Sequence, residues 1–168
     1  DVRINASTRL IDPHGDDALP GDGVVGSPVE DADIVVRFGT GDYPGFRVDR
    51  MMPASMTPMC SPRLIAEGPP LREPADLRNH VLIHDNVRYD DGRSLWDAWF
   101  EKAGVEGADT SHGLRFSHAM LALEAAADGM GVTMGMTALA GADLASGRLV
   151  APLKLALSLK FAYYIVSG

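Results

Sequence analysis

The sequence has little that would brace the chain covalently or carry it into a membrane. It contains a single cysteine, Cys60, among 168 residues, so no disulfide bond can form within the chain. No apolar run approaches the roughly 20 residues that span a bilayer. The residues that follow Asp1 also lack the charged and apolar regions of a signal peptide. We therefore expect a cytoplasmic protein that folds without disulfide bonds.

Positive charge is scarce as well. The chain has 15 Lys and Arg residues against 23 Asp and Glu residues, which gives a net charge of −8 at pH 7. The arginines are spread singly among acidic residues and form no stripe of the kind that grips a nucleic-acid backbone. If this protein regulates DNA, another segment must therefore make the contact. We expect no membrane contact either.

Motifs of common catalytic and cofactor sites are missing. There is no G-x-S-x-G elbow, no H-E-x-x-H helix and no G-x-x-x-x-G-K phosphate loop. We therefore expect no enzyme activity, no cofactor and no metal. One enzyme alternative stays open, because Cys60 precedes an expected helix start that would lower the pKa of its thiol. His84, His112 and His118 are then available as bases; the other reading of Cys60 is a buried structural residue.

What remains is the composition of a globular α/β domain, 46% of it hydrophobic. The stretch from Asp33 to Gly45 reads DIVVRFGTGDYPG and predicts a strand that ends in a glycine-rich loop. Its apolar residues are β-branched and too few for a buried helix. In the loop, Thr40 offers a hydroxyl between two glycines, which permit close approach of a ligand. Ligands of α/β proteins bind at such strand ends, although an ordinary surface turn has the same composition.

Hydrophobic spacing and capping residues predict the other elements. Ser94 is the expected N-cap of a helix that ends at Gly104, and the tryptophans on its apolar face are expected in the core rather than in a ligand stack. The segment from Asp12 to Asp31 shows no periodicity and is expected to be an exposed loop. Strands are expected at 2–6, 34–38, 51–60, 80–84, 132–134, 149–151 and 161–166, and helical segments at 63–66, 74–77, 95–103, 119–128 and 136–145.

The alanine-rich helix from Ala119 to Asp128 has a serine and a histidine at its start. Ser117 is the expected N-cap. The first turn of a helix presents free N–H groups and a partial positive charge. Ser117 and His118 therefore lie where a polar or anionic ligand would be held, unless Ser117 merely caps the helix.

In order and spacing, these segments resemble the effector-binding domain of LysR-type transcriptional regulators, most closely the subgroup of the glycine-cleavage activator and the β-lactamase regulator. The resemblance covers the whole chain except the loop from Asp12 to Asp31. The segments that carry it are DADIVVRFGTGDYPG, CSPRL, PADLRNHVLIHD, WDAW, GLRFSHAMLALEAAADGMGV and FAYYIV.

The resemblance implies an α/β, two-lobed, periplasmic-binding-protein-like (type 2) fold that is truncated at both ends. The first lobe, residues 1–52 plus 156–168, would be incomplete; the second would comprise residues 53–155. Members of the family hold a small effector between the lobes and transmit its occupancy to an N-terminal winged helix-turn-helix. The chain has no such DNA-binding domain, so DNA would be contacted only through that missing part, in a homodimer or homotetramer.

Carried over by position, the resemblance also implies which residues face the effector. Their hydroxyl, imidazole and backbone N–H groups suit a small polar or carboxylate ligand. A free-standing solute-binding protein of the same fold is the alternative to a regulator. The implied effector-binding residues are Ser7, Thr8, Thr40, Ser117, His118 and Tyr163.

Overall fold

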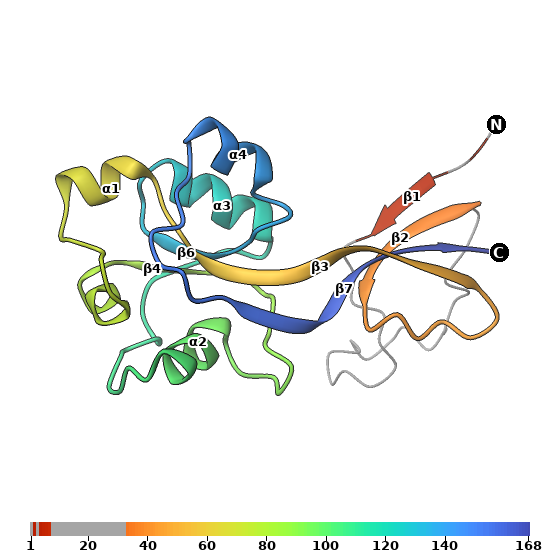
Figure 1. Ribbon diagram of the computed structural model, residues 1–168, viewed down its shortest axis with the longest axis horizontal. Helices are drawn as coiled ribbons and strands as arrows, with labels where there is room; N and C mark the ends of the chain where they lie inside the picture. Colours follow the sequence, from red (N-terminus) through yellow and green to blue (C-terminus); the bar gives the residue numbers. More distant parts are fainter. Residues whose placement is uncertain (1, 3, 8–32) are drawn as a thin grey trace. The chain divides into compact units, whose positions relative to one another are not determined.

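The computed structural model describes residues 2, 4–7 and 33–168 (Figure 1). The loop expected from Asp12 to Asp31 lies outside the described residues. The chain divides into two compact units, Asp1–Ala54 with Lys160–Gly168 and Ser55–Leu159. Two strands, β3 (Arg47–Met59) and β7 (Leu157–Ser167), run from one unit into the other.

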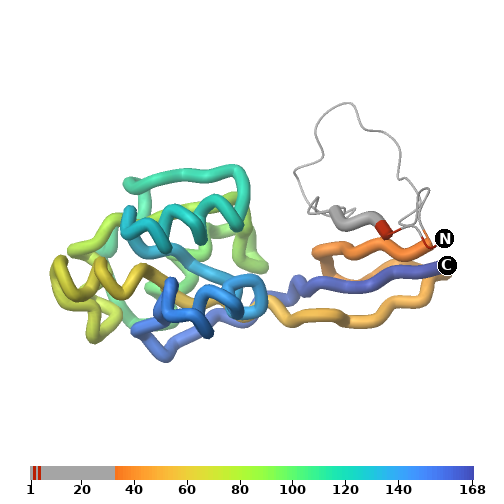
Figure 2. Tube along the Cα trace, turned by 90° about the horizontal axis from the view of Figure 1, so that it is seen from above, coloured from red at the N-terminus to blue at the C-terminus, as the bar shows by residue number. Residues whose placement is uncertain are grey.

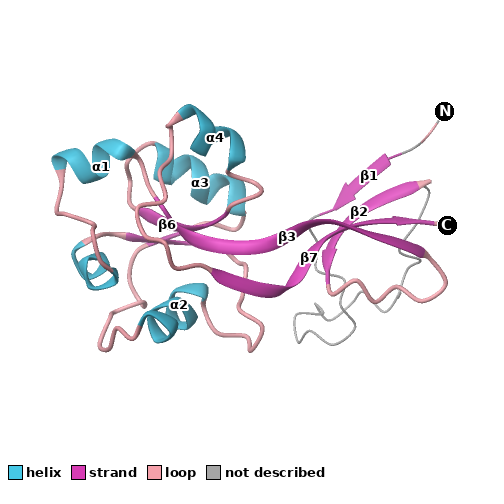
Figure 3. Cartoon of the chain, in the orientation of Figure 1, coloured by secondary structure: helices cyan, strands magenta, loops and turns pink. Residues whose placement is uncertain are grey.

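In the first unit, β1 (Ile4–Ser7) and β2 (Ile34–Gly39) are parallel, with Ile4 opposite Ile34. Strand β2 is antiparallel to β7, with Phe38 opposite Tyr163. The Phe38 ring centroid lies 4.9 Å from that of Tyr163 and 5.9 Å from that of Phe161. Figure 3 shows the described residues of this unit as strands and loops. The strands expected at 34–38 and 161–166 are thus confirmed, although β7 is longer than expected.

The second unit has the strand order β3-β6-β4-β5. Strand β3 is antiparallel to β6, whereas β6 and β4, and β4 and β5, are parallel. In Figure 1, α3 and α4 lie above these strands and α2 lies below them; Figure 2 shows the same chain from above. The elements are β4 (Leu82–His84), β5 (Leu114–Arg115), β6 (Val132–Met136), α1 (Pro62–Glu67), the 3₁₀ helix η1 (Pro74–Asn79), α2 (Leu95–Ala103), α3 (Ala119–Ala127) and α4 (Gly141–Ser146).

Helix α2 begins and ends where its sequence predicts. The Ser94 side chain accepts a hydrogen bond from the Asp97 N–H at 3.0 Å, and Gly104 closes the helix with a φ of 70°. Its two tryptophans are buried in the core, as expected. Trp96 Nε1 donates to the Ile83 carbonyl and Trp99 Nε1 donates to the Leu155 carbonyl, each at 3.0 Å.

Helix α3 covers the other face of this sheet. Its Leu123 and Ala126 side chains pack with Met59 of β3 and Ile83 of β4 in one buried cluster. A side chain at Gly135 of β6 would crowd this cluster, because a Cβ there would collide with Met59 Sδ and lie 3.1 Å from Leu123 Cδ2. Short, small-residue contacts of this kind let the helix lie close to the strands and fix the position of its first turn.

Two predicted elements are wrong. The helix expected from 136 begins only at Gly141, because β6 continues through Met136, which is buried and pairs with Met56. The strand expected at 149–151 is a single bridge between Cys60 and Val150. Met136 pairs with β3, and Val150 pairs with Cys60, the residue after β3. Such long-range pairing decides the structure in both places, and local spacing in the sequence does not reveal it. No helix among the described residues is long and apolar enough to cross a bilayer.

The tryptophan hydrogen bonds allow a stability test. We expect Trp99→Phe to lower the free energy of unfolding by about 1–3 kcal/mol, because the fully buried ring loses its hydrogen bond to the Leu155 carbonyl and part of its packing. Urea denaturation followed by circular dichroism measures the change. Met120→Ala, at a side chain that is 41% exposed, is the control and should stay within about 0.5 kcal/mol. Equal midpoints for Trp99→Phe and the unaltered chain would contradict this account of α2.

Cys60 allows a reactivity test. It is fully buried, and burial raises the pKa of its thiol to about 11, opposite to the lowering that the enzyme alternative requires. At pH 8 only about one thiol in a thousand is then ionised. We expect a disulfide reagent such as DTNB to label the native chain very slowly at pH 8 and the urea-unfolded chain at once. Labelling of the native chain as fast as of glutathione would show an accessible, reactive thiol instead.

Candidate functional site

In the first unit, Thr40 follows β2 directly and is exposed. Aromatic side chains lie close to the glycines on either side of it. A Cβ on Gly39 would collide with the Tyr43 hydroxyl, and one on Gly41, which has a φ of +86°, would lie 2.6 Å from the Tyr164 ring. The loop is therefore held tightly against these rings rather than being a loose turn, and it fixes the backbone on both sides of Thr40.

Tyr163 belongs to the same unit. Its half-buried ring packs against Phe38, and burial raises the pKa of its hydroxyl, which therefore stays protonated and both donates and accepts hydrogen bonds. Phe38 is its partner in the strand register, and Thr40 lies two residues beyond Phe38. Ser7 is the last residue of β1, opposite Arg37; Thr8 lies outside the described residues.

In the second unit, the start of α3 differs from the prediction. The N-cap is His118, not Ser117: the Nδ1 atom of His118 accepts a hydrogen bond from the Met120 N–H at 3.2 Å. His118 has the extended backbone of a cap residue, with a φ of −143° and a ψ of 133°. Its ring takes the place that a serine hydroxyl was expected to fill. Ser117 is exposed, and among the described residues its hydroxyl has no hydrogen-bond partner.

The sequence analysis missed Asp85, which follows β4. Its carboxylate accepts a hydrogen bond from the Val87 N–H at 2.8 Å. Burial raises the pKa of Asp85, while that hydrogen bond and the charges of His118 and Arg88 act in the opposite direction. Asp85 therefore lies within electrostatic reach of the start of α3. An aspartate immediately after the short apolar strand LIH was the available indication in the sequence.

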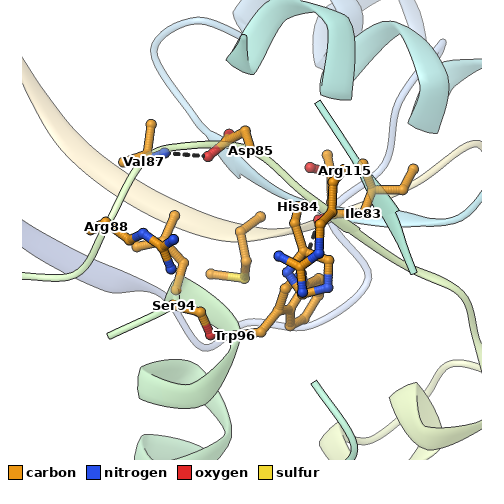
Figure 4. Close-up of a pocket in the computed structure, with 11 residues that line it drawn as sticks. Ile83, His84, Asp85, Val87, Arg88, Ser94, Trp96 and Arg115 are labelled. Carbon is orange, nitrogen blue, oxygen red and sulfur yellow. Dashed lines mark hydrogen bonds between the residues drawn. The ribbon is translucent and has the colours of Figure 1, made fainter. Parts of the chain in front are cut away.

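Beside Asp85 lies a small, shallow hollow that is open to solvent (Figure 4). We call it the β4–α2 hollow. Residues from β4, the loop after it, the start of α2, β5 and β6 form its walls. They are Ile83, His84, Asp85, Val87, Arg88, Ser94, Leu95, Trp96, Arg115, Thr133 and Met134.

His84, in the wall of this hollow, is buried. Its Nε2 atom lies 2.9 Å from the His112 carbonyl, which is consistent with a protonated Nε2 that donates this bond. Burial is the main cause that lowers the pKa of His84. The lowered pKa favours the neutral imidazole, which shapes the wall.

No group of three His, Cys, Asp or Glu side chains among the described residues is arranged to hold a metal ion. Asp109, Ser111 and His112 do form a hydrogen-bonded set, but all three are on one exposed loop and the Ser111 hydroxyl donates to Asp109 at 2.6 Å. Bonds from Ser111 and His112 lower the pKa of Asp109 to about 2, so this set stabilises the loop.

Comparison with known proteins agrees with this reading of the chain. Residues 29–167 match the LysR substrate binding domain family. The glycine cleavage system transcriptional activator of Escherichia coli K12 is 33% identical over 166 residues, which cover 99% of this chain and 48% of that protein. The transcriptional activator AmpR of Pseudomonas aeruginosa is 32% identical over 124 residues, or 73% of this chain and 39% of that protein.

A solved structure supports the fold. The AmpR effector binding domain from Citrobacter freundii superposes with a TM-score of 0.68 at 27% identity, over 86% of this chain and 68% of that one. The fold is thus the type 2 periplasmic-binding-protein-like fold, and the resemblance to the subgroup of the glycine-cleavage and β-lactamase regulators is confirmed. The chain spans about half the length of the curated relatives it matches.

The matched family, the curated relatives and the solved structure lead to one conclusion: the chain belongs to the LysR substrate-binding domain family.

Proposed function

We propose that this domain senses a small polar effector, a carboxylate or amino-acid-like molecule, bound between a first lobe of residues 1–52 and 156–168 and a second lobe of residues 53–155. Effector occupancy would be transmitted to a helix-turn-helix domain in the full-length regulator. The observation that carries the proposal is the start of α3, where an exposed serine hydroxyl is not used as a cap and stands beside the His118 ring.

The second lobe supplies fixed polar groups at that place. The Ser117 hydroxyl and the Ala119 N–H are donors there, because the Met120 and Leu121 N–H groups already bond to His118. The helix adds a partial positive charge. The packing of α3 against Met59 and Ile83 holds the first turn in place. A ligand carboxylate accepts hydrogen bonds, so these donors match it without a large cost of ordering.

The first lobe would contribute Thr40 and Tyr163, together with Ser7 and Thr8. Hydroxyl groups both donate and accept, which suits a ligand that carries several polar groups. A ligand that contacts both lobes favours whichever arrangement of the lobes lets it do so. Its differential affinity for the two arrangements, typically about 1–3 kcal/mol, limits how far it shifts their populations.

We further propose that the regulator contacts DNA through its helix-turn-helix alone, acts in the cytoplasm, and assembles as a homodimer or homotetramer. The net charge of −8 supports a division of labour in which the effector-binding domain does not bind the nucleic-acid backbone. The relatives described above are transcriptional regulators, which favours a sensor over a free-standing solute-binding protein.

Ser117 provides the sharpest test of effector binding. We expect Ser117→Ala to leave the melting temperature of the free chain unchanged, because the side chain is exposed and does not cap α3. The same variant should lose most of the rise in melting temperature that a small carboxylate or amino acid causes in the unaltered chain. Thermal scans against a panel of such molecules measure both quantities, with Ser146→Ala on α4 as the control. An undiminished response of Ser117→Ala would exclude this serine from the site.

His118 separates capping from ligand contact. We expect His118→Ala to destabilise the free chain by about 1 kcal/mol, because the Met120 N–H loses its acceptor. His118→Asn supplies another capping oxygen and should restore stability while still weakening the ligand response. Urea denaturation and ligand titration measure the two effects. If His118→Asn restores both, the imidazole acts only as a cap.

In the full-length regulator, Tyr163→Phe tests signal transmission. We expect operator binding in the absence of effector to be unchanged and the response of transcription to effector to be reduced severalfold, because one donor to the ligand is lost. A reporter assay and a gel-shift assay measure the two properties. Loss of operator binding without effector would instead assign Tyr163 to folding or assembly.

A further inference from the structure

The β4–α2 hollow contains positive charge that no acidic side chain neutralises by an ion pair. Figure 4 shows the Arg88 and Arg115 guanidinium groups on the two sides of the hollow. Among the described residues neither arginine forms a salt bridge, whereas Arg93 and Arg148 each pair with two acids. Arg115 uses one nitrogen, Nη2, to donate to the Ser111 carbonyl at 3.1 Å, which leaves its other N–H groups for a ligand.

We propose that the β4–α2 hollow binds an oxyanion group, a carboxylate or a phosphate, between Arg88 and Arg115. Anion binding in the hollow does not depend on the proposed sensing function. The further step, that the hollow holds an anionic part of the effector, rests on that function. Guanidinium groups present several N–H donors in one plane and match the oxygens of both anions. Every lining residue belongs to the second unit, so the subsite is complete within that unit.

The remaining walls supply neutral donors. The Ser94 oxygen accepts the Asp97 N–H, which leaves its own hydrogen for a ligand in the hollow. Thr133, only 1% exposed, is a second hydroxyl-bearing residue among those that line the hollow. The hollow is shallow and open to solvent, so it would hold only a small charged group at the end of a molecule, which stays partly exposed.

Asp85 allows a test in which a substitution should strengthen anion binding rather than weaken it. It is the one acidic side chain among the residues that line the hollow. Its carboxylate is held by the Val87 N–H and opposes an incoming anion. Removing this charge should therefore tighten anion binding, whereas removing either guanidinium should weaken it. Asparagine at this position keeps an oxygen for the Val87 N–H, so the loop after β4 keeps its hydrogen bond.

The experiment is a titration of the isotope-labelled chain with inorganic phosphate and, separately, with succinate, at constant ionic strength set by chloride. Amide resonances of Arg88, Leu95 and Thr133 report on the hollow. We expect saturable shifts with at least one of the two anions. Arg88→Gln and Arg115→Gln should each weaken binding about tenfold, the effect of losing a charge-assisted hydrogen bond. Asp85→Asn should tighten it, and Arg72→Gln, the same charge change outside the hollow, should not alter it.

The outcomes are distinct. Binding of phosphate alone identifies a phosphate subsite, binding of succinate alone identifies a carboxylate subsite, and binding of both identifies a general oxyanion subsite. Equal weakening by Arg72→Gln, or no saturable shift with either anion, overturns the proposal. Circular dichroism shows whether each variant is folded. Ser117→Ala separates anion binding in the hollow from effector sensing. We expect this variant to leave the anion titration unchanged, so that either claim can fail without the other.

Discussion

The second unit depends on how α2 is anchored. Two buried tryptophans on one face of this helix not only fill the core but also hydrogen bond to backbone carbonyls, Trp96 to Ile83 of β4 and Trp99 to Leu155 in the segment before β7. A second contact, from Thr57 Oγ1 to the Leu155 carbonyl at 3.1 Å, holds the same segment against β3. Because an indole N–H that is buried must find an acceptor, these bonds fix both the depth and the rotation of α2.

That anchoring positions the polar groups of the proposed binding surface. Fixing α2 against β4 positions the loop between them, which carries Asp85 and Arg88, and the packing of α3 on the opposite face positions Ser117 and His118. Polar residues thus lie on loops held by a rigid scaffold, which is where binding residues are concentrated in α/β folds. In the first unit, the rings of Tyr43 and Tyr164 do the same for the loop around Thr40.

Local features of the sequence predicted much of this fold. Ser94 and Gly104 fixed the ends of α2, and the β-branched run after Asp33 identified β2, because caps and strand composition act over a few residues. The cap of α3 was assigned to Ser117 instead of His118, since the choice between neighbouring caps depends on ring geometry. Met136 was placed in a helix because its pairing with Met56 is a long-range contact. Arg88 and Arg115 are far apart in sequence, so only the tertiary structure brings them to one hollow.

The central claim is that a small effector is held by groups from both units, and hydrogen exchange of the backbone amides tests it most directly. Exchange would be measured with and without the first small molecule found to raise the melting temperature of the chain. The account predicts that the effector slows exchange around Gly39–Gly41 in the first unit and around Ser117–Met120 in the second, at the same ligand concentration. Slowing confined to one unit, or none at either segment, would contradict it.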